Sequence, residues 1–236
     1  KDDVLDTFLS FDEKEHPVIC QLGGIIPEQL GVATKIVAKY GYDEINLNVG
    51  CPSDRVSGKR QFGAILMKQS DRCLKLVQAM AENVPPSVRL SVKCRLGVDD
   101  MDSFDELVEF IDKLRPYCQI FYLHARKCLL RKLSPSQNRN VPPLNYPRVY
   151  HICERFPDCV FFLNGGILSI EAVQQIMSGG DVQPEVHGVP CSSCGFENGS
   201  CVRAPCNVPL NLRGVMLGRA AMNRVGLFGN IDQRIY

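Results

Sequence analysis

Short runs rich in β-branched and aromatic residues alternate with segments of helical period along most of this chain, and this alternation limits its fold. Strands that are apolar on both faces and separated by amphipathic helices predict a parallel sheet. The predicted strands are Pro17–Leu22, Glu44–Asn48, Leu90–Arg95, Ile120–His124, Val160–Asn164 and Gly214–Leu217. The predicted helices are Pro27–Tyr40, Asp71–Asn83, Ser103–Leu114, Pro147–Phe156 and Ser169–Ser178. The fold class is therefore α/β, either a doubly wound sheet or an eight-stranded barrel.

The residues at the strand ends favour the barrel. Nearly every predicted strand finishes in polar or glycine residues, among them Gln21, Asn48, Lys93, His124, Asn164 and Gly218. In a β/α barrel the carboxyl ends of all strands converge on one face, where active sites lie. A doubly wound sheet would instead concentrate such residues at one switch point. We therefore predict a (β/α)8 TIM barrel, although the sequence shows only six of its eight strands.

Composition sets outer bounds on function. The chain has 236 residues, 45% of them hydrophobic, and a formal net charge of +1, so nothing draws it globally to nucleic acid or membrane. There is no apolar run of about 18 residues and no signal-peptide pattern at the charged start "KDDVLDTF". We expect a soluble, monomeric, cytoplasmic protein without membrane contact, and we leave an organelle open.

Two glycine-containing strand ends predict a phosphate site. Asn164-Gly165-Gly166 and Gly218-Arg219 follow the last two predicted strands, and each precedes a helix. The loops after strands seven and eight of a barrel often hold a phosphate on backbone N–H groups. Arg219 adds a side chain suited to bidentate contact with an anion. The alternative is a pair of ordinary turns.

Polar side chains at other strand ends are candidates for ring contacts. Lys93 and His124 come from adjacent strands, so they can face one ligand, and Gln21 offers both a donor and an acceptor. Cys51 lies in a Gly-Cys-Pro turn just beyond a strand. An unperturbed thiol has a pKa of about 8.5 and stays mostly protonated near neutral pH, which suits a proton donor. The alternatives are a solvated lysine, a structural histidine and a packed turn cysteine.

Two basic loops follow strand ends on the same predicted face. They contain Arg55, Lys59 and Arg60 in one loop and Arg126, Lys127, Arg131 and Lys132 in the other. In a nearly neutral protein such loops indicate contact with a phosphate backbone, with ordinary solvated charge as the alternative.

A cysteine-rich insert precedes the last predicted strand. It spans residues 181–213 and contains Cys191, Cys194, Cys201 and Cys206, four of the twelve cysteines of the chain. The Cys-x-x-Cys spacing of the first pair suits zinc, and the second pair is spaced more widely. We consider a zinc site with four thiolate ligands, or an insert without metal.

Seven segments of the chain together resemble one family, the tRNA-dihydrouridine synthases. They are "EINLNVGCPSDRV", "FGAILM", "SVKCRLGVDD", "LHARKCLL", "LSPSQNRNVPPLNY", "FLNGGI" and "GVMLGRAA". The similarity is greatest to the bacterial subgroup that acts on D-loop uridines 20 and 20a. It implies an FMN-binding TIM barrel followed by a helical tRNA-binding domain. It also implies that NADPH reduces the flavin, which passes hydride to C6 of a flipped uridine in tRNA.

The resemblance implies a role for each matching residue. Cys51 would protonate C5 of the uridine, and Asn48 and Arg126 would contact the uracil, with Arg55 and Lys127 as further substrate contacts. Gln21, Lys93 and His124 would contact the flavin ring and ribityl chain. The phosphate end of FMN would be held by Asn164, Gly165, Gly166, Gly218 and Arg219.

The chain also departs from the family pattern. It begins after the two strands with which the family starts, so residues 1–236 would form a barrel domain truncated at its N-terminus. It ends where the helical tRNA-binding domain would follow. We therefore carry a second hypothesis, a non-catalytic RNA-binding remnant that does not hold flavin.

Overall fold

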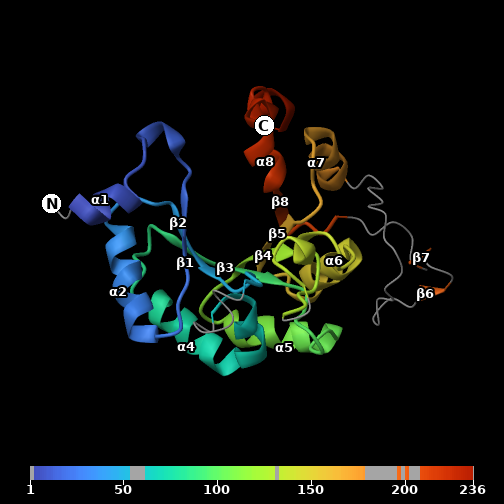
Figure 1. The fold of residues 1–236 in the computed structure, drawn as a ribbon, viewed down its shortest axis with the longest axis horizontal. Helices are drawn as coiled ribbons and strands as arrows, with labels where there is room; N and C mark the ends of the chain where they lie inside the picture. Colours follow the sequence, from blue (N-terminus) through green and yellow to red (C-terminus); the bar gives the residue numbers. More distant parts are fainter. Residues whose placement is uncertain are drawn as a thin grey trace.

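A computed structural model describes residues 3–53, 62–130, 133–178, 196–197, 200–201 and 208–235 of the chain (Figure 1). Its centre is a parallel sheet of six strands in the order β1-β2-β3-β4-β5-β8. These strands are β1 (Ile19–Leu22), β2 (Glu44–Asn48), β3 (Arg89–Arg95), β4 (Ile120–His124), β5 (Val160–Asn164) and β8 (Leu212–Met216). The six predicted strands are therefore confirmed.

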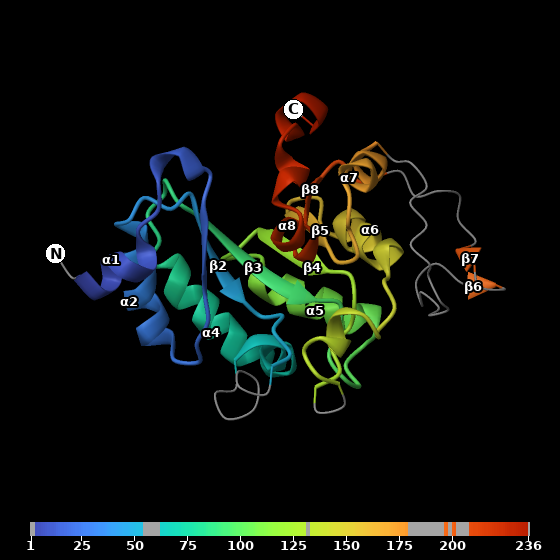
Figure 2. The same cartoon turned by 45° about the horizontal axis from the view of Figure 1, so that its top comes forward.

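The helices that connect the strands cover one side of this sheet. They are α2 (Pro27–Ala38), α4 (Ser70–Ala81), α5 (Phe104–Leu114), α6 (Tyr146–Arg155) and α7 (Ile170–Met177). From α2 to α6 each helix contacts the next, so these four form one continuous outer layer (Figures 1 and 2). The strand order is consecutive, unlike the order of a doubly wound sheet, which reverses at a switch point. Among the described residues β1 and β8 are the sheet edges, and closure into a barrel stays a prediction.

The two faces of the sheet differ because successive side chains of a strand point to opposite sides. Ile45, Leu47 and Val92 point toward the helices and are fully buried, as are Phe121 and Leu163. The positions between them carry the polar side chains of the inner face. The hydrophobic core thus lies between sheet and helices, and the inner face remains for a ligand.

Local sequence explains where several helices begin. Ser103 caps α5 by accepting a hydrogen bond from the backbone N–H of Glu106, whose side chain reciprocates, as in a capping box. Ser169 caps α7 through the N–H of Ala172, and α2 begins with Pro27. Each of these helix starts fixes the end of the loop that precedes it. These loops follow the carboxyl ends of β3, β5 and β1.

Several elements were not predicted. Helix α1 (Asp3–Leu9), the 3-10 helices η1 (Glu13–Glu15), η2 (Gly63–Gln69), η3 (Gln137–Arg139) and η4 (Val225–Phe228), and helix α9 (Ile231–Ile235) are short. The predicted short helix after Gly218 is α8 (Arg219–Asn223). None of the helices in the described part of the chain is long and apolar enough to cross a membrane.

The last strand begins earlier than predicted. Because β8 starts at Leu212, its first two residues lie inside the segment 181–213 that we assigned to the cysteine-rich insert. Within that segment a two-stranded antiparallel pair, β6 (Phe196–Glu197) and β7 (Ser200–Cys201), is described. Most of the insert lies outside the described residues.

Candidate active site

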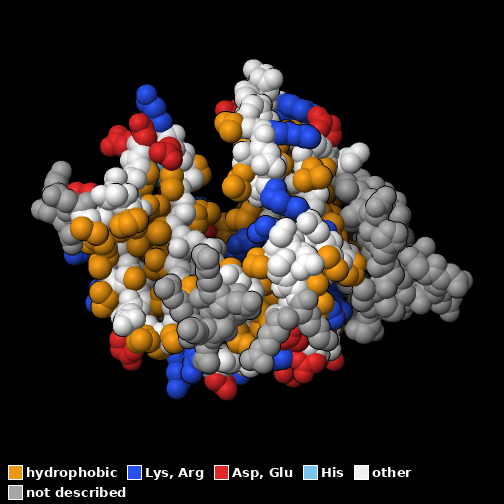
Figure 3. Space-filling model, viewed as in Figure 1, with side chains coloured by type: hydrophobic (Ala, Val, Ile, Leu, Met, Phe, Trp, Pro, Cys, Tyr) orange, Lys and Arg blue, Asp and Glu red, His pale blue; other side chains and the backbone are white. Residues whose placement is uncertain are grey.

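A cavity of about 790 Å³ opens on the inner face of the sheet, at the carboxyl ends of the strands. In the space-filling view it is the hollow beside which Lys and Arg side chains gather (Figure 3). Its wall includes ten of the predicted site residues: Gln21, Asn48, Cys51, Lys93, His124, Asn164, Gly165, Gly166, Gly218 and Arg219. The fold therefore brings together residues that are up to about 200 positions apart in the sequence.

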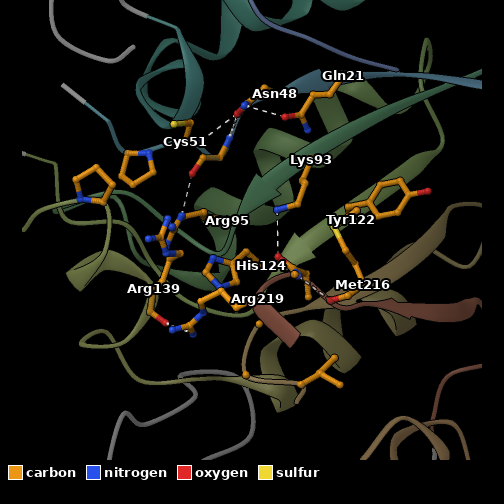
Figure 4. Close-up of a pocket in the computed structure, with 18 of the residues that line it drawn as sticks. Gln21, Asn48, Cys51, Lys93, Arg95, Tyr122, His124, Arg139, Met216 and Arg219 are labelled. Carbon is orange, nitrogen blue, oxygen red and sulfur yellow. Dashed lines mark hydrogen bonds between the residues drawn. The ribbon is translucent and has the colours of Figure 1, made fainter. Parts of the chain in front are cut away.

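The turn that carries Cys51 is held by hydrogen bonds from several directions (Figure 4). The side-chain oxygen of Asn48 accepts from the backbone N–H groups of Gly50, at 3.1 Å, and Cys51, at 3.0 Å. The carbonyl of Cys51 accepts from the N–H of Ala64, and the guanidinium Nε of Arg95 donates to the carbonyl of Gly50 at 3.0 Å. The thiol thus sits on a fixed backbone at the rim of the cavity.

Lys93 projects from β3 into the cavity and contacts Asn164 at the end of β5. Its ammonium donates to the Asn164 side-chain oxygen at 3.1 Å, and the Asn164 amide nitrogen donates to the carbonyl of Met216 at 2.8 Å. Burial, and secondarily the charge of Arg95, lowers the pKa of Lys93 to about 8. Lys93 is therefore a cation that titrates close to neutral pH.

His124 ends β4 and lies against the glycine turn after β5. A Cβ atom at Gly165 would stand 2.6 Å from Cδ2 of the His124 ring, so only glycine permits this approach. Burial, and then the positive charges of Arg95, Lys93, Arg126 and Arg219, lowers the pKa of His124 to about 2. The imidazole is consequently neutral, able to donate from one ring nitrogen and accept at the other.

The charge of the cavity wall has one sign. Lys93, Arg95, Arg139 and Arg219 line it, and no Asp or Glu does so among the residues that the structure describes. Arg219 reaches from α8 across to the side-chain oxygen of Asn140, at 2.8 Å. Such a wall suits an anionic ligand, since nothing on it opposes negative charge.

Three glycines lie in the part of the cavity where the sequence predicts a phosphate site. Gly165 and Gly166 have φ of 111° and 75°, which favour glycine. A Cβ atom added at Gly218 would have no neighbouring atom within 4 Å, so a ligand can approach the backbone there. The glycine turn, the free space at Gly218 and the Arg219 guanidinium therefore lie around one part of the cavity wall.

Two predicted substrate contacts lie elsewhere. Arg126 lines a neighbouring cavity of about 770 Å³, which shares Gly166 and Arg219 with the first. Its Nη1 donates to the carbonyls of Asn140 and Pro142, and its Nε is buried without a hydrogen-bond partner. Because of this bonding to the loop carbonyls, the structure does not bring Arg126 into the first cavity.

Lys127 is also absent from the wall of the first cavity. Its ammonium pairs with the carboxylate of Asp102 at 2.9 Å, and Arg148 pairs with the same carboxylate. A lysine engaged in this way has less charge to offer to a phosphate. Arg55 lies outside the described residues.

The cysteines fall into two groups. Eight are described as free thiols, and only Cys20 and Cys51 among them are partly exposed. Cys191, Cys194 and Cys206 lie outside the described residues, as does the side chain of Cys201. Within the part of the chain that is described, no three His, Cys, Asp or Glu side chains come close enough to hold a metal ion.

Sequence reasoning missed several residues of the wall. Arg95 and Asn46 lie two residues from predicted site residues, Lys93 and Asn48, and thus on the same side of their strands. That spacing is a signal that could have identified both. Arg139 comes from a 3-10 turn far along the chain, and nothing local in the sequence points to the cavity.

Together these features define a cationic, polar pocket beside a thiol, at the carboxyl edge of a parallel α/β sheet. Residues 3–189 match the family model described as dihydrouridine synthase. This chain therefore belongs to the dihydrouridine synthase family.

Curated relatives carry a more specific name. The chain is 40% identical over 228 residues to the tRNA-dihydrouridine(20/20a) synthase of Haemophilus ducreyi, covering 97% of this chain and 60% of that protein. It is 41% identical over 229 residues to the protein of the same name from Pasteurella multocida, covering 97% and 59%. The chain thus spans less than two thirds of the length of these relatives. Among solved structures, Proteus mirabilis N-acetylneuraminate lyase aligns with a TM-score of 0.49 at 8% identity, over 92% of this chain and 61% of that chain.

Proposed function

We propose that this chain carries the catalytic part of an enzyme that reduces uridine in tRNA to 5,6-dihydrouridine, with FMN as cofactor and NADPH as reductant. Membership of the family and the names of the relatives support the reaction and the substrate. One observation carries the proposal furthest: the firmly held Cys51 turn shares a cavity with the glycine turn and four cationic side chains. We further propose that the six strands belong to a β/α barrel.

The residues of the cavity fit FMN. The dianionic phosphate would rest on Arg219 and on the backbone around Gly165, Gly166 and Gly218, where space is open beside the chain. Lys93, Gln21 and the neutral His124 would contact the carbonyl-bearing ring and the ribityl chain. When bound and reduced, FMN supplies the hydride that adds to C6 of the uracil.

Cys51 would complete the reduction by giving its thiol proton to C5. The C–H bond forms as the S–H bond breaks, and the product carries two more hydrogen atoms than uridine. Lys93 and Arg95 line the same cavity as Cys51, so negative charge that develops there during the reaction would lie near two cations. Because Cys51 is only partly buried, the thiolate can recover a proton from water.

The substrate would enter as a flipped nucleotide. A base paired within RNA cannot reach an atom at the bottom of such a cavity, so the uridine must leave its stack. Asn48 would contact the uracil ring. Since Arg126 lines the neighbouring cavity, we propose that it contacts the sugar-phosphate next to the flipped base, with Arg55 and Lys127 further along the backbone. Uridines 20 and 20a are the proposed targets because they are named in the relatives.

The proposal is tested by loading the purified chain with FMN, desalting it and recording its visible absorption. The loaded protein is then mixed with NADPH and unmodified tRNA. The tRNA is digested, and the masses of its nucleosides are measured by mass spectrometry. Retained flavin and a uridine heavier by two hydrogen atoms support the proposal. A colourless protein that still binds tRNA would instead support the RNA-binding remnant. Free uridine serves as the control substrate and should not react.

A further inference from the structure

A chain of hydrogen bonds runs from the Cys51 turn to the buried carboxylate of Glu44. The amide nitrogen of Asn48 donates to the side-chain oxygen of Gln21 at 3.0 Å, and that of Gln21 donates to Asn46 at 2.7 Å. Asn46 donates to the hydroxyl of Ser91 at 2.7 Å, and Ser91 donates to Glu44 at 2.5 Å. Three neighbouring strands contribute, because Gln21, Asn46 and Ser91 are register partners across β1, β2 and β3.

The inner end of this chain is fully enclosed. Ser91 is completely buried, Glu44 is 1% exposed and Asn46 is 3% exposed. The Nε of Arg89 lies 3.5 Å from the second carboxylate oxygen of Glu44. A buried polar group without a partner is costly, so a network of this kind is stable only when each member is satisfied.

Both ends of the chain fix its direction. At the outer end the backbone N–H groups of Gly50 and Cys51 can only donate, so Asn48 must turn its oxygen toward them. At the inner end the Ser91 hydroxyl accepts from Asn46 and donates its own proton to an oxygen of Glu44. Every amide between the two ends then has one orientation, and a flip of any of them would place two donors or two acceptors together.

This direction determines what the cavity wall presents. Each carboxamide nitrogen has two N–H groups, and the chain uses one from Asn48 and one from Gln21. The remaining N–H groups belong to side chains on the cavity wall. A ring with carbonyl oxygens can accept hydrogen bonds from these N–H groups. A ring with an amino group in the same place would instead bring two N–H donors together, and no hydrogen bond would form.

We infer that Glu44, Ser91 and Asn46 are positioning residues, which hold the amides of Gln21 and Asn48 so that their N–H groups select a carbonyl-bearing ring. The inference rests on the proposed function for the identity of that ring, a uracil or a flavin. It assigns a role in ligand selection to Asn46 on the cavity wall and to two buried side chains outside that wall, Glu44 and Ser91.

Three variants separate orientation from packing. Ser91→Ala removes the link between Asn46 and Glu44. Glu44→Gln keeps the shape of the side chain but replaces one carboxyl oxygen with an NH2 donor, so the inner end no longer sets the direction of the chain. Arg89→Gln is the matched control, since it removes the same ion pair and leaves the acceptor in place.

The first measurement is hydrogen exchange of the side-chain amides of Gln21 and Asn48, followed by nitrogen-15 NMR on the full chain. Loss of one buried hydrogen bond costs about 1.4 kcal/mol, which corresponds to a tenfold change in exchange rate. Exchange of both amides should therefore be about tenfold faster in Ser91→Ala and Glu44→Gln. It should not change in Arg89→Gln. Unchanged exchange in both test variants would overturn the inference, as would an equal effect in the control.

A second measurement compares kcat and KM on tRNA that carries uridine or cytidine at the target position. We expect kcat/KM for uridine to fall about tenfold in Ser91→Ala and Glu44→Gln, with a smaller preference over cytidine, while FMN is retained. Loss of uridine turnover with an unaltered preference for uridine over cytidine and an unaltered Kd for FMN would overturn ligand selection. A wild-type chain with slowly exchanging amides but no dihydrouridine formation would count against the proposed function alone.

Discussion

The side-chain oxygen of Asn48 lies 3.0 Å from the backbone nitrogen of Cys51, and this hydrogen bond joins the end of β2 to the turn that presents the thiol. The same oxygen also accepts from Gly50. A strand that ends in an amide can therefore set the backbone of the following turn. The bonds from Asn48 to this turn are short-range in the sequence, whereas the bond from Arg95 to Gly50 and the other groups of the cavity come from distant parts of the chain.

Asn48→Ala should lower dihydrouridine formation by roughly 10- to 100-fold. Two backbone N–H groups lose their acceptor, and a displacement of the thiol by about 1 Å is enough for such a loss. Asn48→Asp keeps an oxygen at this position and should retain more activity than the alanine variant. Single-turnover rates with prereduced enzyme measure the effect. Equal rates for Asn48→Ala and the wild type would show that the turn does not depend on this side chain.

Cys51→Ala should stop formation of dihydrouridine while NADPH still reduces the bound flavin. The proton donor is lost, but the residues predicted to hold the cofactor are untouched. Flavin absorbance under anaerobic conditions follows the reduction, and mass spectrometry of the tRNA follows the product. Cys20→Ala is the control, since Cys20 is the other partly exposed thiol among the described cysteines. Full product formation by Cys51→Ala would remove the thiol from the reaction.

FMN affinity should fall as the pH rises through about 8. The pKa of Lys93 is lowered to about 8 by burial, so the ammonium is lost above that pH and its attraction to an anionic ligand goes with it. We expect the Kd for FMN to rise several-fold between pH 7 and pH 9. Fluorescence quenching on binding provides the measurement. Lys93→Met should bind weakly at both pH values, and a wild-type Kd that does not change with pH would contradict the prediction.

His124 should make the protein less stable in acid. Burial and neighbouring cations lower the pKa of His124 to about 2, whereas the unfolded chain binds the same proton below about 6.5. Between these values the unfolded state holds more protons, so lowering the pH favours unfolding by up to about 1.4 kcal/mol per pH unit. Urea denaturation at pH 4, 5 and 6 should show a shallower pH dependence for His124→Gln. Parallel curves for the two proteins would indicate an ordinary histidine.

Two glycines of the cavity should respond differently to alanine. Gly166→Ala should lower the free energy of unfolding by about 1 to 3 kcal/mol, because φ is positive and a Cβ atom would collide with the Leu144 side chain. Gly218→Ala should leave stability unchanged but weaken FMN binding, since its Cβ atom would enter open space on the cavity wall. Gly226→Ala, also in open space but away from the cavity, is the control. Equal FMN affinity for Gly218→Ala and Gly226→Ala would exclude Gly218 from the phosphate site.

The amino-acid sequence by itself determined the strands, the connecting helices and the residues at the strand ends. Periodicity and caps such as Ser103 are local signals, so they can be interpreted without knowledge of the fold. The glycine turn at Gly165 is also a local signal, because glycine is the residue that adopts a positive φ most readily. Since parallel strands finish at one edge of a sheet, their end residues could be predicted to share a site.

The tertiary structure alone decided which side chains meet across that site. Arg126 was predicted to contact the uracil, and this stays a prediction; the structure places its guanidinium on the carbonyls of Asn140 and Pro142, beside a second cavity. Arg139 reaches the cavity from a turn that no local pattern connects with it. The partners of Glu44 and Ser91 also depend on strand register. Such pairings join residues distant in sequence, and their energies depend on distances that only the folded chain sets.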